Sequence, residues 1–464
     1  MAKDRYQEEP RQVLSAFSAI CMMVGMVVGI GIFRTPAIVA GNVSGETMFL
    51  LAWVAGGAVT LIGALCYSEL ASAHPHAGGE YHFLSRAFGK PVAMMFGWAR
   101  CSVIQTGSIA AVAFVLGDYM ARLWPLGEHA SAIYAAIGVS VFTGINMMGT
   151  RPGKNVQVVA TLLVVAAIIT LIVLGLTTQP SDASVAPAPA SAPDGRGAFG
   201  MAMIFVLLTY GGWNEAAYLT GELENPRRNI PKVLALGTVV LVVLYLAVNF
   251  AFLRVLGLEV IRDSQTVAAD MMRVVSGPAG ERMVSIAILL AALSTLNATI
   301  FTGARVFYVM ARDMTVMRWV GIWDERGTTP VNGYLLQGAV ALVLIGLGAV
   351  TRDGFQSMVD YTAPVFWSFM LLVAISLFIL RRREPAIDRP FRVPLYPLTP
   401  LLFCLTCVGM LYSSIAYTGW AGLIGLAVLL AGTPLLLFRR KDDLPAPDSQ
   451  AGPAASSPVK GDVP

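Results

Sequence analysis

The stretch Val24-Gly-Met-Val-Val-Gly-Ile-Gly-Ile-Phe33 places three glycines inside a long apolar run near the N-terminus. Glycine inside a helix costs about 1 kcal/mol relative to alanine. Three glycines in one apolar segment therefore indicate either an interrupted helix or very close packing against a neighbouring helix. Farther along the chain, Tyr210-Gly-Gly-Trp-Asn214 places a glycine pair in a second apolar run. The two stretches together predict two interrupted helices.

The composition of the chain predicts a membrane protein. Hydrophobic residues make up 56% of the 464 residues and charged residues only 13%, whereas soluble domains carry about 25% charged residues. Apolar runs of about 20 residues recur along the chain, and each is long enough to cross roughly 30 Å of hydrocarbon as a helix. The net charge of +4 does not favour a nucleic-acid partner, because the basic residues lie in short loops between apolar runs.

The apolar runs and the charged residues between them predict an all-α protein of about twelve transmembrane helices. The expected segments are 13–40, 46–73, 91–124, 130–149, 154–178, 199–220, 231–256, 280–312, 330–350, 355–380, 394–417 and 418–438. Most Lys and Arg residues, including the run Arg381-Arg-Arg383, share one side when the N-terminus is cytoplasmic. The positive-inside rule therefore predicts a multi-pass protein of the cell inner membrane with both termini cytoplasmic.

The polar ends and one loop differ from the rest of the chain in composition. Residues 1–12 form a charged cytoplasmic N-terminus, and residues 441–464 form a Pro-, Ala- and Ser-rich cytoplasmic tail. Residues 179–198 have a similar composition and fall outside the cell. Such compositions are typical of flexible, solvated chain.

No catalytic or metal site is expected. All five cysteines lie inside apolar runs, and the four histidines lie in loops, so neither a disulfide framework, a metal site nor a nucleophile–base pair is indicated. The phosphate-binding pattern G-x-x-x-x-G-K-[ST] is absent from the sequence. We expect no catalytic residues, no metal and no cofactor, apart from a possible coupling ion, H⁺ or Na⁺.

Several stretches in fixed order resemble the amino acid-polyamine-organocation (APC) superfamily, and in particular its L-type amino acid transporter-like permeases. They are Val28-Gly-Ile-Gly-Ile-Phe33, Tyr67-Ser-Glu-Leu70, Gly78-Gly-Glu-Tyr81, Tyr210-Gly-Gly-Trp-Asn214 and Glu222-Leu-Glu-Asn-Pro-Arg-Arg-Asn-Ile-Pro231. The resemblance implies a LeuT-type fold with helices 1 and 6 broken. Its two inverted repeats of five helices would span 13–178 and 199–380, and two extra helices would follow within 381–440. It also implies secondary transport of amino acids by alternating access, as a permease or an exchanger.

The resemblance also implies a substrate site at the two breaks. The family's carboxylate-binding backbone falls on Gly29, Ile30 and Gly31, next to Val27, and its amine-binding carbonyls fall around Leu208 and Gly211. Asn214 would support the unwound segment or touch the substrate. Relatives often carry a small polar residue at position 30 and a phenylalanine lid at position 208. Ile30 and Leu208 therefore imply a more apolar site.

The side chain of Glu215 leaves the substrate class open. A cavity-facing carboxylate at this depth would favour a cationic amine, whereas a carboxylate paired with a neighbouring helix, or reaching the cytoplasmic vestibule, would not. Ile30 and Leu208 favour neutral amino acids, and Glu215 supports the alternative of a cationic amino acid or polyamine transporter. A sensor that binds an amine without transporting it is a further alternative.

Two departures from the relatives concern coupling and assembly. Many relatives carry a lysine on helix 5 at the position of Val164. What remains for coupling are the hydroxyls of Ser294 and Thr295, which in sodium-coupled members join backbone of helix 1, here Gly25 and Val28. Alternatively, these hydroxyls bond back to helix 8 carbonyls four residues earlier. The loop 122–131 lacks the cysteine that links heteromeric members to a glycoprotein, so no disulfide-linked accessory subunit is expected.

Overall fold

The protein was analysed in a computed structural model that describes residues 14–29, 31–76, 78–148, 154–178, 197–221, 223–313, 319–320, 330–351 and 353–438. The expected termini 1–12 and 441–464 lie outside the described residues, as does nearly all of the expected loop 179–198.

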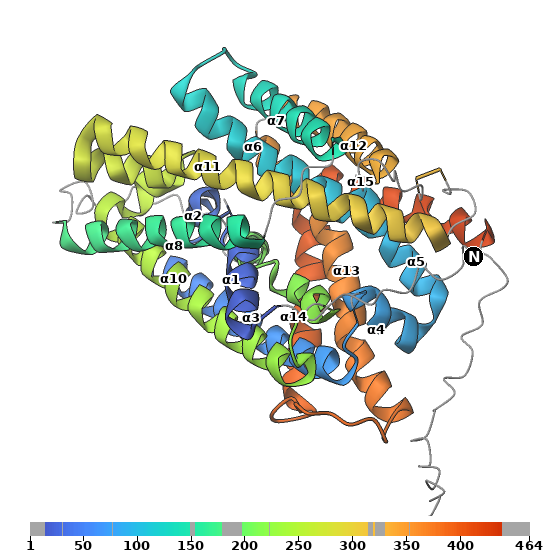
Figure 1. The fold of residues 1–464 in the computed structure, drawn as a ribbon. Coiled ribbons are helices and arrows are strands. Elements are labelled where there is room, and N and C mark those ends of the chain that lie inside the picture. Colours follow the sequence, from blue (N-terminus) through green and yellow to red (C-terminus); the bar gives the residue numbers. More distant parts are fainter. Residues whose placement is uncertain are drawn as a thin grey trace, which may run out of the picture.

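The described chain folds into one bundle of helices (Figure 1). The first half contains α1 (Ala16–Val27), α2 (Gly31–Gly41), α3 (Glu46–Ala73), α4 (Gly79–Phe88), α5 (Lys90–Ala99), the π-helix η1 (Arg100–Ile104), α6 (Gln105–Leu123), α7 (Ala130–Met147) and α8 (Lys154–Thr177). The second half contains α9 (Gly197–Thr209), the 3₁₀-helix η3 (Trp213–Gly221), α10 (Pro226–Asp263), α11 (Val267–Asp313), α12 (Val331–Ala349), α13 (Gly354–Arg383), α14 (Leu398–Tyr417), α15 (Gly419–Ala431) and η4 (Thr433–Phe438).

The predicted path of membrane-spanning segments is confirmed. Among the described residues, nine helices are long and apolar enough to cross a bilayer, and the bent pair α1 and α2 raises the number to ten. The shorter apolar part of α8, Thr161–Thr177, and the pair α9 and η3 occupy the remaining two expected segments. Each of the twelve expected segments thus has a helix or an interrupted helix at its position.

Two connections differ from the expectation. The loop expected after helix 2 contains α4, a short helix between Gly78 and Gly89 that buries Phe83, Leu84 and Ala87. The loop expected between helices 7 and 8 is largely helical, because α10 and α11 each continue past a kink, at Gly257 (φ 73°) and Gly277 (φ 69°). Both glycines have positive φ, a backbone conformation that glycine adopts without steric cost, and the chain changes direction at each of them.

Helices at corresponding positions of the two halves pack against each other. Contacts join α1 to η3, α2 to α9, α3 to α10, α6 to α11 and α7 to α12. This pairing is the one expected if the second half repeats the first by a two-fold rotation in the membrane plane. The expected residue boundaries of the repeats stay a prediction.

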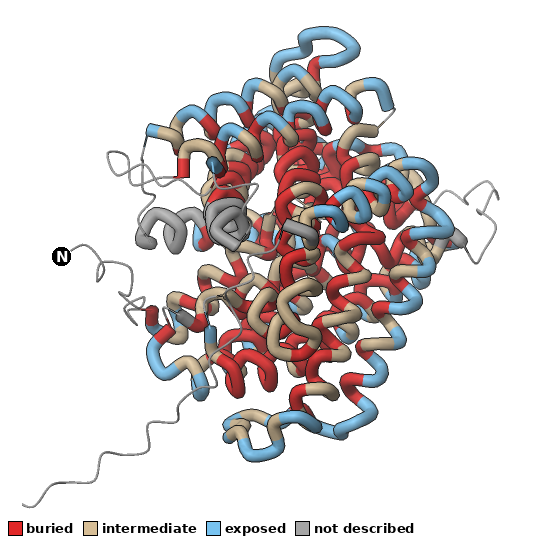
Figure 2. The backbone as a smooth tube through the Cα atoms, turned by 90° about the vertical axis from the view of Figure 1, so that its right-hand side faces the viewer, coloured by how far each residue is buried: buried red, intermediate tan, exposed pale blue. Residues whose placement is uncertain are grey.

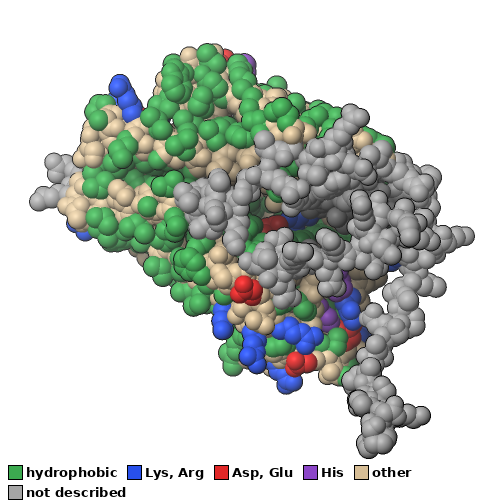
Figure 3. Space-filling model, viewed as in Figure 1, with side chains coloured by type: hydrophobic (Ala, Val, Ile, Leu, Met, Phe, Trp, Pro, Cys, Tyr) green, Lys and Arg blue, Asp and Glu red, His purple; other side chains and the backbone are tan. Residues whose placement is uncertain are grey.

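Burial separates a packed centre from a lipid-facing rim. Figure 2 shows buried backbone through the middle of the bundle and exposed backbone along its outer helices. Figure 3 shows hydrophobic side chains over most of the visible bundle and charged side chains gathered at its lower end. Large exposed apolar residues such as Leu163, Val243 and Leu290 belong to spanning helices, as expected for side chains solvated by lipid.

Candidate functional site

The first predicted interruption is confirmed. It separates α1, which ends at Val27, from α2, which begins at Gly31, and the two helix axes are bent by 47°. The N–H of Gly29 donates to the Val27 carbonyl over 2.6 Å, and the Tyr245 hydroxyl donates to the same carbonyl over 2.9 Å. Ile30 lies outside the described residues.

The second predicted interruption is confirmed as well. The helix α9 ends at Thr209, and η3 begins at Trp213. Between them, the N–H of Gly211 donates to the Leu208 carbonyl over 2.8 Å. Gly212 has φ 99°, a backbone conformation that residues with a side chain rarely adopt. Gly212 is therefore required by the turn itself.

The two interruptions face each other. A Cβ atom built on Gly212 would lie 3.4 Å from the Met26 carbonyl oxygen, at the end of α1. A Cβ atom built on Gly31 would lie 3.6 Å from Oγ1 of Thr209, at the end of α9. The glycines thus let the backbones of the two broken helices approach closely at one place.

The N-terminus of α2 has the electrostatics expected of a carboxylate site. The first N–H groups of a helix, here beginning at Gly31, have no carbonyl one turn earlier to bond. They attract anions together with the helix dipole. The N–H of the expected donor Gly29 bonds the Val27 carbonyl in this structure, and the role of Gly29 in substrate binding stays a prediction. The N–H groups at the start of α2 are therefore the ones left available for an anion.

The predicted amine side lies at the end of α9. The Leu208 carbonyl accepts the N–H of Gly211, and a carbonyl oxygen has a second lone pair for another donor. The Leu208 side chain is 38% exposed, so the expected lid residue is not part of the packed core. Gly211 also borders an apolar pocket lined by Val59, Thr60, Leu207, Trp213, Phe366, Trp367, Met370 and Phe403.

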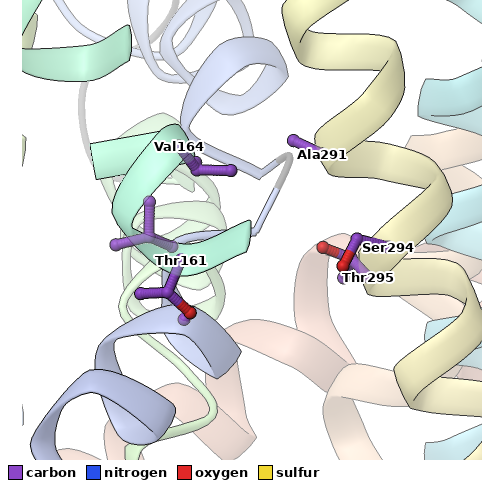
Figure 4. A pocket seen from close by; sticks show the side chains of 7 residues that line it. Thr161, Val164, Ala291, Ser294 and Thr295 are labelled. Atoms are coloured by element: carbon purple, nitrogen blue, oxygen red, sulfur yellow. The ribbon is translucent and has the colours of Figure 1, made fainter. Parts of the chain in front are cut away.

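All five residues expected to act in coupling line a second pocket, between α1, α8 and α11. Its lining consists of Gly25, Val28, Thr161, Val164, Ala291, Ser294 and Thr295. Figure 4 shows Thr161 and Val164 on α8 across the pocket from Ser294 and Thr295 on α11. Residues from three distant stretches of the sequence thus meet at one place beside the break in helix 1.

The hydroxyls of Ser294 and Thr295 do not bond back to their own helix. On the same helix, Thr299 donates to the Thr295 carbonyl and Ser285 donates to the Glu281 carbonyl, each over 2.7 Å. Among the described residues, the hydroxyls of Ser294 and Thr295 make no hydrogen bond, although the carbonyls four residues earlier are described. The alternative in which they bond back is therefore wrong for this structure.

Thr161 also lines this pocket and was not among the residues predicted from the sequence. Its Oγ1 would lie 2.0 Å from a Cβ atom built on Gly25, so it lies directly against helix 1. The available signal was spacing, because Thr161 lies three residues before Val164 and therefore on the same helix face. The Thr161 hydroxyl therefore lies on α8, the fifth membrane-spanning helix, about one turn from Val164, the position at which many relatives carry a lysine.

Glu215 is paired with a neighbouring helix. Both of its carboxylate oxygens lie 2.6 Å from Nη2 of Arg100 in η1. Nη1 of Arg100 bonds Tyr218 over 3.2 Å and Glu80 over 3.4 Å. Asn214 donates to Glu80 over 3.0 Å, so this expected site residue supports the unwound segment. Of the two readings of Glu215, the structure shows the paired one.

Arg100 is a second residue that was not predicted from the sequence. It lies in the apolar run expected as helix 3, and an arginine at membrane depth is a functional candidate by default. It is only 5% exposed and begins the π-helical turn Arg100–Ile104. Such turns are frequent at functional sites. Burial raises the pKa of the nearby Glu80 carboxyl, while the charge of Arg100 opposes that rise.

A second buried arginine bridges helices on the other side of the breaks. Arg34 of α2 bonds Asp353, the N-cap of α13. It also bonds the Ser264 carbonyl over 3.3 Å and lies 3.8 Å from Asp118 of α6. It is 6% exposed. Because α2 packs on α9 whereas α1 packs on η3, Arg34 and Glu215 belong to opposite halves of the broken helices.

The described residues place no group of three or more His, Cys, Asp or Glu side chains that could hold a metal ion. All five cysteines are free thiols. The geometry of the site is therefore that of backbone ends, hydroxyls and two buried ion clusters.

Comparison with known proteins agrees with this geometry. A sequence profile described as "Amino acid permease" matches residues 14–432. The chain is 29% identical over 422 residues to the b(0,+)-type amino acid transporter 1 of Rattus norvegicus, covering 89% of this chain and 85% of that one. It is 26% identical over 426 residues to the serine/threonine exchanger SteT of Bacillus subtilis (91% and 95% covered), and 26% identical over 437 residues to the large neutral amino acids transporter small subunit 2 of Mus musculus (92% and 80% covered). The chain is a multi-pass membrane protein and belongs to the amino acid permease family of the amino acid-polyamine-organocation superfamily.

Proposed function

We propose that the protein is a secondary transporter that exchanges amino acids by alternating access. The observation that carries this proposal is the pair of facing interruptions in helices 1 and 6. An amino acid has a carboxylate and an ammonium group, and the start of α2 at Gly31 can bind the first while carbonyls around Leu208 bind the second. A zwitterion is held in this way without a charged side chain at the bilayer midplane, where such a charge is costly.

Neutral amino acids fit this site better than cationic ones. Glu215, the one carboxylate directly after the break that could select a cation, is paired with Arg100 through both oxygens. The partly exposed Leu208 adds an apolar wall. The alternative of a cationic amino acid or polyamine transporter would require this ion pair to open during binding.

The two buried arginines suit alternating access. Arg34 ties the α2 half of helix 1 to α6 and α13, and Arg100 ties η1 to the η3 half of helix 6. Opening the site to one side requires one of these clusters to break while the other holds. By the positive-inside rule the Arg100 cluster faces the cytoplasm, both termini are cytoplasmic, and the protein lies in the cell inner membrane.

Sodium coupling is a second candidate, carried by one observation. The hydroxyls of Ser294 and Thr295 make no hydrogen bond among the described residues and line a pocket with backbone of Gly25 and Val28. Hydroxyl and backbone carbonyl oxygens are the ligands that a hard cation such as Na⁺ prefers. If sodium gradients stimulate uptake, Ser294→Ala should remove the stimulation. The control Thr299→Val should keep it, because the Thr299 hydroxyl is bonded to the Thr295 carbonyl.

We propose neither a catalytic activity nor an accessory subunit for this protein. We infer that it is not an enzyme, because the breaks present backbone groups and no nucleophile–base pair. A disulfide-linked accessory subunit is not required either. A sensor that binds an amino acid without moving it is the remaining alternative, and only a transport measurement separates it from an exchanger.

The test uses purified protein in sealed proteoliposomes. Vesicles preloaded with unlabelled amino acid should accumulate labelled neutral amino acid, and empty vesicles should accumulate little. A competition panel of neutral, cationic and acidic amino acids then ranks the substrates. Binding without any movement of label would favour the sensor, and equal uptake into empty and preloaded vesicles would overturn exchange.

A further inference from the structure

The Arg100 cluster holds two carboxylates in unequal environments. Glu80 is buried at 5% side-chain exposure, whereas Glu215 retains 32%. Tyr67, Asn214 and Tyr218 donate to Glu80 over 2.6, 3.0 and 3.1 Å. Glu80 is therefore satisfied by several neutral donors as well as by Arg100. Among the described residues, Arg100 supplies both of the side-chain hydrogen bonds that Glu215 accepts.

The position of Glu215 lies within reach of a substrate bound at the breaks. Its N–H donates to the Gly212 carbonyl over 3.1 Å, and Gly212 lies against the end of α1. Because a 3₁₀-helix rises about 2 Å per residue, Glu215 lies roughly 6 Å along η3 from the break. The extended side chain of lysine, arginine or a diamine spans a comparable length. A free carboxylate at this place would meet the distal cation of such a substrate.

Arginine is suited to keep this carboxylate occupied. A guanidinium does not lose its proton and offers several donors at once. Arg100 is further fixed by Tyr218, whose ring centroid lies 4.9 Å from the guanidinium carbon, and by the π-helical turn from which it projects. The Arg100–Glu215 ion pair is thus held in place by the protein, through Arg100 at the start of η1, and does not need the substrate.

We propose that Arg100 determines the charge selectivity of transport by occupying Glu215, so that neutral amino acids are accepted and cationic ones are disfavoured. This rests on the proposed function. Arg100 is a specificity-determining residue that acts through Glu215 and does not contact a neutral substrate. Loss of its charge leaves a partly exposed carboxylate beside the site, and a lysine-like, arginine-like or diamine ligand restores the charge balance.

The test compares ligand binding to purified Arg100→Met, Arg100→Lys, Glu215→Gln and the double variant Arg100→Met/Glu215→Gln. Thermal shifts are recorded with leucine, lysine, arginine and putrescine. For Arg100→Met we expect the affinity for the cationic ligands, relative to leucine, to rise at least about tenfold. Arg100→Lys, Glu215→Gln and the double variant should keep the wild-type ratio, because each leaves Glu215 either paired or uncharged.

Some outcomes would overturn the proposal. An unchanged ratio in Arg100→Met would do so, and so would the same gain in the double variant, since the gain must come from Glu215. Where methionine prevents folding, Arg100→Gln removes the charge while keeping an amide donor, and it must show the gain. If neither neutral variant inserts while Arg100→Lys does, the arginine is structural and the proposal fails. Wild-type protein that binds neutral amino acids but moves none would overturn the transport proposal and leave this comparison intact.

Discussion

Gly25 of α1 lies against the hydroxyl of Thr161 in α8, so closely that a Cβ atom on Gly25 would stand 2.0 Å from Thr161 Oγ1. No side chain fits there unless Thr161, or one of the helices α1 and α8, shifts. The glycine therefore serves helix packing, while the neighbouring Gly29 and Gly31 lie at the break itself. The same motif carries both roles that glycines play in membrane helices.

Gly25→Ala should destabilise the protein by about 1–3 kcal/mol, the usual cost of overpacking. Thermal unfolding of the purified variant measures this. Adding Thr161→Ala should recover part of the loss, because only the Thr161 Cβ, 3.0 Å from the new methyl group, remains. Gly409→Ala is the matched control, since a Cβ there meets nothing within 4 Å. Equal melting temperatures for Gly25→Ala and Gly409→Ala would contradict the close contact.

Gly31→Val should abolish substrate binding while leaving the protein folded and inserted. A Cβ at Gly31 would make only ordinary contact, 3.6 Å from Thr209 Oγ1, so the fold can accept it. The branched side chain would cover the start of α2, where the substrate carboxylate is expected. Ligand-induced thermal shifts measure the loss, and Gly346→Val, which meets nothing within 4 Å, is the control. Normal binding by Gly31→Val would mean that this glycine serves packing only.

The helix path and both breaks were predictable because their signals are local. Apolar length, mid-segment glycines and charged loops lie within each segment and need no partner to be recognised. The partners of Glu215 and Gly25 were not predictable in this way. Arg100 and Glu215 are separated by 115 positions in the chain, and Thr161 is likewise remote from Gly25. Only the fold decides which of several polar side chains meet, and a single sequence carries no measure of that contact.

Two histidines, His74 at the end of α3 and His82 within α4, should make the protein less stable in mild acid. Burial lowers the pKa of His74 to about 4 and that of His82 to about 3, from an ordinary value of 6.5. The unfolded chain therefore binds more protons than the folded chain below about pH 6.5, and stability falls as the pH decreases toward 4. Melting temperatures from pH 7.5 to 5 test this. The fall should be shallower in His82→Gln, and an identical pH profile would argue against the histidines as its cause.

Transport should not require an accessory subunit. The connection between α6 and α7 contains no cysteine, and the five cysteines of the chain are free. Reconstituted protein alone should therefore exchange amino acids, and thiol reductant should not change its rate. Uptake that appears only after a second membrane protein is added would contradict this expectation.

Coupling of transport to an ion gradient should not depend on a lysine of α8, the fifth membrane-spanning helix. Val164 occupies the position at which many relatives carry that lysine, and it lines the pocket with Gly25, Ser294 and Thr295. Lys154 stands at the start of α8, about 15 Å from Val164 along the helix at 1.5 Å per residue. That distance exceeds the reach of a lysine side chain. Lys154→Gln should therefore keep coupled uptake near the wild-type rate in proteoliposomes.

Val164→Lys is the informative counterpart, because it places an ammonium group beside the hydroxyls of Ser294 and Thr295, which make no hydrogen bond to the described residues. We expect it to change the ion dependence of uptake and to remove any stimulation by sodium, since the new charge occupies the place of a cation. A Lys154→Gln protein that inserts normally yet loses all coupled transport would show that coupling does depend on the lysine at the start of α8. A Val164→Lys protein with wild-type ion dependence would show that the pocket takes no part in coupling.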